Sequence, residues 1–389
     1  MKKQLDLFAT TENDFDFDEM KQKLIDNLDM LKEMSVEEQT LYKKWQEMNK
    51  GGKMSKIKKK LSTYQTNLWV PADINDTERT IKEIQDLDPY VEMATPGKGV
   101  TEWVNYRKLI HTMEWVANPG RNMKFWVRDR KTNKVLGLIC LGSDVTSIKV
   151  RDAYIGWDKV NKFEQHKLNN TAIATTICST QPAGYNMLMG KLVAALTTCK
   201  TIRDAWEEKY GDKLIAVGTT SLYGINSMYN GMPHFKTMGE TAGQVRLKPD
   251  DEVYLPWNSW LKENHPEEHL KAINATGPKQ NIINKVFKHC SIKPSTYDHG
   301  FKRGVYLAMM YDNGCEFLRN EIEEEELKLK KKFQDDLPYT EKWWKKKAIK
   351  RYKNMYEQDR IKPEQLFYWD VIDLSWEDTQ NKYIKEVGR

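Results

Sequence analysis

The spacing of apolar residues gives the chain helical ends and a middle that alternates strands with helices. Over residues 19–48, leucines recur at steps of three and four, which predicts an amphipathic helix. Ser35, followed three positions later by Glu38, predicts a capping box at the start of a second helix. Residues 53–60 are mostly lysine and predict a solvated basic arm, and the helical pattern returns from about residue 258.

The middle of the chain contains short runs of β-branched and apolar residues. These runs predict strands at residues 123–129, 134–145, 171–180 and 212–224. A turn joins the first two strands as a pair, and the stretch 181–211 predicts a loop that runs into one helix ending at Gly211. Because a strand, a helix and another strand follow one another, we expect a parallel crossover and a mixed α/β core.

These patterns divide the chain into four segments. We expect a disordered acidic tail over residues 1–18, a helical basic arm over 19–65, an α/β core over 66–257 and a helical basic region over 258–389.

Composition narrows the class of protein. The 13 Trp, 18 Tyr and 11 Phe supply enough core material to exclude disorder throughout. No apolar run is long enough to span a membrane and no secretory signal is evident, so we expect a cytoplasmic protein of a bacterial host cell and no membrane partner. The five cysteines are scattered and never form a C-x-x-C pair, so neither a disulfide framework nor a metal is predicted.

The net charge of +6 is modest, but basic residues are concentrated in two places. One is residues 43–60, and the other is residues 342–353, where seven basic residues alternate with Trp343, Trp344 and Tyr352. Lysines neutralise phosphates and aromatic rings stack on bases, so both segments predict contact with DNA. The simpler alternative is a helix that packs its aromatic face on the core and leaves its lysines in water. The predicted nucleic-acid residues are Lys58, Lys59, Lys60, Lys345, Lys346, Lys347, Lys350 and Arg351.

Residues 181–186 stand at a predicted strand-to-helix junction. Such a junction points free backbone N–H groups at one spot, which suits a pyrophosphate, and Gly184 permits a close approach of the backbone. The alternative is a tight turn that needs its glycine and proline only for shape.

A family resemblance rests on several short motifs in a fixed order. They are residues 135–143, 151–159, 168–170, 181–186, 218–230 and 238–243. Over about residues 120–255 the chain resembles the family of the Druantia anti-phage protein DruA, in a version like that of marine phages. That family is similar in layout to GNAT acyltransferases and to the phage Mom protein, which modifies adenine in DNA.

The resemblance implies that the α/β core is a GNAT-like mixed sheet, with a donor site and a general acid. In a GNAT enzyme the pattern Q/R-x-x-G-x-G/A holds the pyrophosphate of an acyl-CoA. Gln181 and Gly184 match it, Tyr185 lies within it, and Asn186 stands in place of the last glycine or alanine. The implied cofactor is an acyl-CoA, such as acetyl-CoA, or another acyl donor. Either Tyr229 or Tyr223 is a candidate acid for the leaving thiolate, the alternative being a tyrosine of the core or of a turn.

Two further polar residues follow predicted strands. Asp144 follows the apolar run 135–142 of its predicted strand, at a position where strands feed sites in α/β sheets, and is a candidate catalytic residue. Ser221 closes a Thr-Thr-Ser run that either hydrogen-bonds a ligand or caps a strand edge.

The N-terminal peptide Gln4-Leu5-Asp6-Leu7-Phe8 resembles the bacterial sliding-clamp-binding motif at all five positions. Leu7 and Phe8 suit a hydrophobic pocket, and a disordered tail suits the display of such a peptide. A chance pentapeptide, or a strand docked on the chain's own core, is the alternative.

Three functions follow from these features. The leading hypothesis is phage DNA modification, in which a small acyl-derived group is transferred to a DNA base. The second is a non-catalytic DNA-binding or defence-related subunit recruited to the replication clamp, which Asn186 favours. The third is a replication modulator that acts mainly by occupying the clamp.

Overall fold

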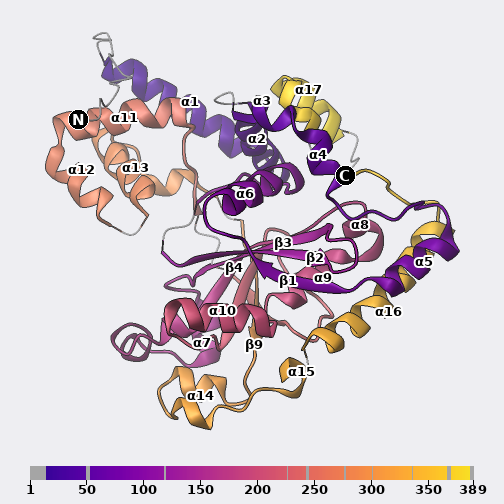
Figure 1. Ribbon diagram of the computed structural model, residues 1–389. Coiled ribbons are helices and arrows are strands. Elements are labelled where there is room, and N and C mark those ends of the chain that lie inside the picture. The colour runs from indigo at the N-terminus through magenta and orange to yellow at the C-terminus, as the bar shows by residue number, and fades with distance from the viewer. Residues whose placement is uncertain are drawn as a thin grey trace, which may run out of the picture. The chain divides into compact units, whose positions relative to one another are not determined.

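The computed structural model describes residues 15–49, 53–117, 120–225, 227–241, 245–275, 277–299, 301–334, 336–365 and 369–385 (Figure 1). The chain forms two compact units. The smaller unit comprises residues 1–39 and 243–301, and the larger comprises residues 40–242 and 302–389. The segment 258–389, taken above as one region, is thus divided between the two units.

A seven-stranded mixed sheet forms the centre of the larger unit, with strand order β1-β2-β3-β4-β5-β9-β6. The strands are β1 (Pro89–Met93), β2 (Asn122–Asp129), β3 (Val135–Ser143), β4 (Thr171–Ser179), β5 (Ala216–Ser221), β6 (Lys236–Glu240) and β9 (Gly304–Met309). Neighbouring strands are antiparallel except β4 and β5, which are parallel. The predicted α/β class and the parallel crossover are confirmed.

The parallel strands β4 and β5 pair over only three positions. Thr171 lies opposite Ala216 and Ile173 lies opposite Gly218, and both strands then continue beyond this short ladder. The carboxyl halves of the two strands therefore do not pair with each other and leave an opening in the hydrogen-bonded ladder.

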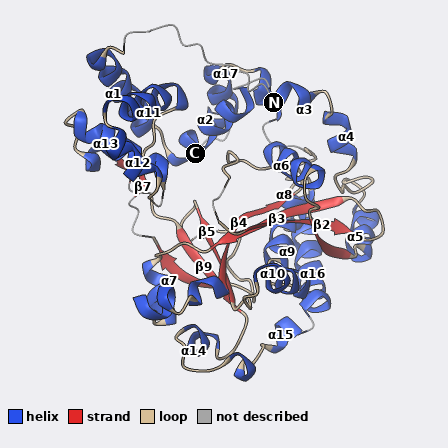
Figure 2. Cartoon of the chain, turned by 60° about the vertical axis from the view of Figure 1, so that its left-hand side comes forward, coloured by secondary structure: helices blue, strands red, loops and turns tan. Residues whose placement is uncertain are grey.

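Helices cover both faces of the sheet, α6 on one face and α9, α10 and α16 on the other (Figures 1 and 2). The helices of this unit are α2 (Val36–Asn49), α3 (Lys53–Lys58), α4 (Leu61–Thr66), α5 (Thr77–Asp86), α6 (Lys98–Ile110), α7 (Lys149–Ile155), α8 (Ala183–Met187), α9 (Met189–Leu196), α10 (Lys200–Tyr210), α14 (Gly314–Leu318), α15 (Lys331–Gln334), α16 (Asp336–Glu357) and α17 (Trp376–Gln380). The first helix of the chain, α1, and the first residues of α2 belong to the smaller unit.

The stretch 181–211 is three helices instead of the one predicted. Leu188 adopts a left-handed conformation (φ 53°) between α8 and α9. The indole of Trp344 donates to the carbonyls of Met187 and Leu188 at 3.2 and 3.1 Å, so the break leaves these groups satisfied. After α9, Thr197 donates its hydroxyl to the carbonyl of Ala194, and this local bond competes with helix continuation. The helix end at Gly211 is confirmed.

Two predicted segments differ from the structure. The lysine-rich arm is a helix, α3, whose Met54 and Ile57 are buried in a cluster with Trp103, so the segment is anchored instead of solvated. The region after residue 258 is not wholly helical, because β9 enters the sheet between β5 and β6 with every residue buried. Periodicity cannot identify so short an apolar run as a strand.

The smaller unit is a helical cluster with a two-stranded ribbon. It contains α1 (Phe17–Glu33), α11 (Asp251–Asn264), α12 (Pro266–Ile273), α13 (Pro278–His289), β7 (Val245–Arg246) and β8 (Asp298–His299). The predicted capping box is confirmed, since Ser35 Oγ and Glu38 exchange hydrogen bonds with each other's backbone N–H groups. The Asp16 side chain caps α1, which begins at Phe17, so the last residues of the predicted disordered tail are ordered; residues 1–14 of that prediction lie outside the described residues.

No helix in the described ranges is both long enough and apolar enough to cross a membrane.

Candidate functional site

The predicted donor loop leaves the carboxyl end of β4 and enters α8, as the sequence predicts. Three of its backbone N–H groups, however, are engaged within the loop. The N–H of Gly184 donates to the carbonyl of Thr180 at 2.8 Å, and that of Tyr185 donates to Gln181 Oε1 at 2.9 Å. The N–H of Asn186 donates to the carbonyl of Pro182 at 3.2 Å. A pyrophosphate would have to displace these bonds, so the loop as folded does not fit that group.

Gly184 is closely packed against side chains of the loop itself. A Cβ atom at this position would lie 2.6 Å from Ser179 Oγ and 2.9 Å from Gln181 Nε2. The observation matches the tight-turn alternative, in which the glycine serves the shape of the chain.

Asn186 holds the segment that follows α16. Its fully buried amide donates to the carbonyl of Lys362 at 2.6 Å and accepts from the Lys362 N–H at 3.0 Å. The neighbouring Tyr185 ring lies 4.7 Å from the Lys362 ammonium and 5.5 Å from the Arg351 guanidinium. Asn186, which departs from the GNAT pattern, therefore binds the chain's own backbone.

Tyr229 lies in a hydrophobic cluster beside the opening between β4 and β5. Its ring packs against Phe235 and Tyr306 with centroids 5.7 and 5.0 Å apart. Burial raises the pKa of this phenol to about 12, although a hydrogen bond with the Thr219 side chain opposes the shift. The group is thus a neutral phenol at pH 7, and its surroundings match the alternative of a core tyrosine.

Tyr223 and Ser221 lie at the carboxyl end of β5. Ser221 is buried, and its Oγ accepts the N–H of Tyr223 at 3.1 Å, so it caps the strand end. The Tyr223 side chain is 62% exposed. The two candidate acids therefore occupy opposite environments, one inside the core and one on the surface.

Asp144 lies at the opposite end of the central strands from Tyr229, Tyr223 and Ser221. Ser143 of β3 pairs with Ala172 near the start of β4, whereas the donor loop and Ser221 follow the ends of β4 and β5. The Asp144 carboxylate pairs with Arg151 Nη1 at 2.6 Å, both side chains being 1% exposed. The structure does not bring Asp144 together with Tyr229, Tyr223 or Ser221.

Arg151 is the centre of a buried ionic network that the sequence did not reveal. Its Nη2 also bonds Asp152 Oδ1 at 2.6 Å and the carbonyl of Val145 at 2.8 Å. Lys162 pairs with the other oxygen of Asp152, and the Trp157 ring lies within 6 Å of both cations, at 5.2 and 5.7 Å. The Trp157 indole donates its N–H to the carbonyl of Leu318, and the residue is partly buried.

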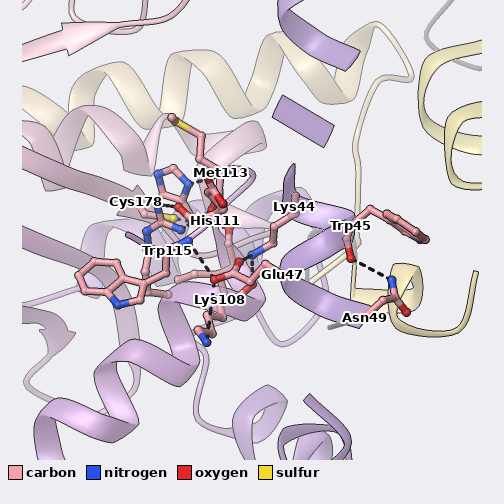
Figure 3. A network of polar contacts seen from close by, with 12 residues as sticks. Lys44, Trp45, Glu47, Asn49, Lys108, His111, Met113, Trp115 and Cys178 are labelled. Atoms are coloured by element: carbon pink, nitrogen blue, oxygen red, sulfur yellow. Dashed lines mark hydrogen bonds and ion pairs between the residues drawn. The ribbon is translucent and has the colours of Figure 1, made fainter. Parts of the chain in front are cut away.

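A second buried network joins α2 to α6 (Figure 3). Lys44 donates to Glu47 Oε2 at 2.8 Å and to the carbonyl of Lys108, and the second oxygen of Glu47 accepts the N–H of Trp115 at 2.9 Å. Burial lowers the pKa of Lys44 to about 8, and burial followed by the charge of Arg107 lowers that of His111 well below its usual value. Each cation has protein acceptors, so the network fastens α2.

The basic residues of α16 separate into an inner and an outer set. Trp344, Ala348 and Tyr352 are fully buried against the sheet-covering helices, and Lys345 bonds Glu341 and the carbonyl of Gln85. Five lysines are exposed along the outer side of the helix: Lys342, Lys346, Lys347, Lys350 and Lys353. None of the five makes an ion pair with another residue in the described part of the chain. We call these five residues the lysine face.

The first basic segment is less available. Lys58 pairs with Asp373, whereas Lys59 and Lys60 are exposed. The clamp-like peptide, residues 4–8, lies outside the residues that the structure describes.

A buried histidine, His234, lies where α16 packs against the core. The His234 ring is 3% exposed, lies 3.0 Å from Thr340 Oγ1 and packs against Trp343. Burial, and to a lesser extent the charge of Lys332, lowers its pKa from 6.5 to about 4.

We expect this histidine to make the protein acid-labile. Between pH 6.5 and 4 the unfolded chain binds a proton at His234 that the folded chain does not, so stability falls as pH falls. The loss between pH 7.5 and pH 5 is expected to be about 2 kcal/mol. Urea unfolding at both pH values should show a smaller difference for His234→Gln than for the wild type, and an equal difference would contradict the assignment.

Comparison with known proteins places these elements in a family. Residues 36–320 match the family model described as Druantia protein DruA. The chain is 26% identical over 253 residues to the curated Druantia protein DruA of Escherichia coli (strain UMEA 4076-1). That alignment covers 60% of this chain, and the chain spans 62% of the length of the relative. No solved structure matches the chain. Because the family model covers well over half of its residues, this chain belongs to the Druantia protein DruA family.

Proposed function

We propose that this chain is a nucleic-acid-binding protein of the DruA family, with a defence-related role, and that the lysine face of α16 contacts the phosphate backbone. The observation that supports it is a row of five exposed lysines on one helix, with no acidic residue between Lys342 and Lys353. Lysines spaced along a helix attract a polyanion because each phosphate contact releases a condensed counterion. The buried aromatic face of α16 fixes the helix on the core and so fixes the geometry of the lysines.

Salt dependence tests this proposal. For Lys346→Ala with Lys350→Ala we expect the slope of log K against log salt, measured by anisotropy of a labelled DNA, to become shallower by about 2. Affinity should fall for all sequences alike, since phosphate contacts carry no sequence information. The matched control is Lys149→Ala with Lys159→Ala, which removes two exposed lysines elsewhere. An equal effect of both pairs would reduce the lysine face to a contribution of net charge.

Transfer of an acyl-derived group to a DNA base stays a prediction from the family resemblance. Because the backbone N–H groups of residues 184–186 are engaged and Asn186 is held by Lys362, we derive no step through an acyl-CoA. Mass spectrometry of nucleosides from DNA of cells that express the chain would detect such a transfer whatever the donor is.

Recruitment by a sliding clamp rests on the peptide Gln4-Leu5-Asp6-Leu7-Phe8 alone. Leu7→Ala with Phe8→Ala is expected to abolish capture of the purified chain by an immobilised bacterial clamp while DNA affinity stays unchanged. Retained capture by the double variant would remove the clamp from the proposed function.

A further inference from the structure

The loop that follows β5 presents apolar side chains to solvent. Tyr223 is 62% exposed, Ile225 is 46% exposed and Met228 is 37% exposed. Three large apolar side chains exposed within six positions form a patch, and exposed apolar patches often mark binding sites.

Hydrogen bonds hold this loop in place from below. The hydroxyl of the fully buried Tyr306 donates to the carbonyl of Ile225 at 2.8 Å. Lys191 of α9 donates to the carbonyls of Met228 and Asn230 at 2.7 and 2.6 Å. The three exposed side chains therefore project from a supported backbone, which lowers the entropic cost of using them for binding.

The loop is connected through α9 to α16, the helix that bears the lysine face. Lys191 and Gly190 stand at the start of α9, where a Cβ on Gly190 would lie 3.2 Å from Met228 Sδ. The Trp344 indole of α16 bonds the carbonyl of Leu188, one residue before α9. Burial and the charge of Lys347 both lower the pKa of Lys191, which places the lysine face within electrostatic reach of the loop.

Charge is distributed unevenly around the loop. On the side of β6, Glu240 Oε1 would lie 3.0 Å from a Cβ on Gly224. On the side of α9 and α16, Lys191 bonds the loop, and Lys347 acts electrostatically on Lys191. A polyanion that crosses this surface is therefore favoured along the α16 side, with its non-ionic parts over the apolar side chains.

We propose that Tyr223, with Ile225 and Met228 beside it, is a stacking platform for unpaired bases, so that the nucleic acid bound by this protein is single-stranded. The inference rests on the proposed function and names its substrate class. A base inside a duplex is already stacked and offers no free face to a tyrosine on a surface loop, whereas a single strand offers a base beside each phosphate. The lysine face takes the phosphates and Tyr223 takes a base.

The test compares a labelled oligothymidine with a duplex of equal length, by anisotropy at fixed salt. Tyr223→Ala should weaken single-strand binding roughly 10-fold, in line with the loss of one base–aromatic stack, and leave duplex binding unchanged. Tyr223→Phe and Tyr223→Trp should keep the affinity, because stacking needs the ring and not the hydroxyl. The matched control is Tyr154→Ala, which removes a tyrosine 38% exposed on α7. Equal melting temperatures should show that all variants are folded.

The failures of the two proposals are distinguishable. If Tyr223→Ala binds the single strand like the wild type while the lysine variant binds it weakly, the platform is refuted and the lysine face stands. If Tyr223→Ala weakens single strand and duplex alike, the assignment to single strands is refuted. If the wild type binds neither, the proposed function itself is refuted.

Discussion

Replacing Arg151 with methionine should lower the free energy of unfolding by about 3–5 kcal/mol, because it leaves the buried Asp144 carboxylate without a cation and Asp152 with Lys162 alone. Asp144 is paired with Arg151 at 2.6 Å, and Asp152 is bonded by the same guanidinium. Methionine fills much of the volume, so the loss reports the charge and not a cavity. Urea unfolding monitored by Trp fluorescence measures it.

A double variant tests whether Asp144 and Arg151 stabilise each other. Asp144→Leu combined with Arg151→Met removes both charges, and the double variant should be more stable than Arg151→Met alone. The single variant Asp144→Leu completes the comparison. If the double variant is destabilised by the sum of the effects of the two single variants, Asp144 and Arg151 do not interact. The same variants address Asp144 as a catalytic candidate: a structural ion pair loses activity only in proportion to the folded fraction, whereas a catalytic carboxylate loses it while the protein is folded.

Gly304→Ala should destabilise the larger unit by about 3 kcal/mol, the upper part of the range for overpacked positions. A Cβ on Gly304 would lie 2.0 Å from the carbonyl oxygen of Gly224 and 2.5 Å from its carbon. Both atoms belong to the backbone, so no side chain can rotate away to make room. The strand β9 or the loop after β5 has to move.

The matched control is Gly218→Ala on the neighbouring strand β5. There the nearest atom to a new Cβ is the carbonyl oxygen of Tyr306 at 3.8 Å, an ordinary contact. We expect it to change the melting temperature little. Equal destabilisation by both substitutions would show that glycine acts through general sheet packing. Because Gly224 directly follows Tyr223, Gly304→Ala should also weaken single-strand binding in whatever fraction stays folded.

The strands with the clearest local patterns were predictable. Strands β2 and β3 follow from their apolar residues and the turn between them, and the β4–β5 crossover follows from the order of the elements. Strand β9 was not predictable, because its pairing partners Ser221 and Glu240 come before a long helical segment of the chain. Only the fold brings these residues next to Gly304. Short-range periodicity contains no information about such distant pairing.

The sequence was enough to name candidate residues for the site, but it did not predict how buried each of them is. The sequence placed Tyr223 and Tyr229 six positions apart in one loop and offered no means to tell them apart. Only Tyr229 is buried, and its burial depends on Tyr306 of β9 and on Phe235, which directly precedes β6. Likewise Arg151 and Lys162 read as ordinary surface cations until the turn after β3 sets them against Asp144 and Asp152.

The neighbouring strands β6 and β9 have a kinetic consequence. Glu240 pairs with Gly304, although 64 positions separate them along the chain, whereas a hairpin joins such strands with a few residues. Within the smaller unit, Val245 pairs with His299, which brings the two ends of the intervening segment together. If that ribbon forms first, the loop that β9 must close shortens from 64 residues to about ten, which saves about 2 kcal/mol of chain entropy. The fastest route to the completed sheet therefore runs through early folding of the inserted helical unit.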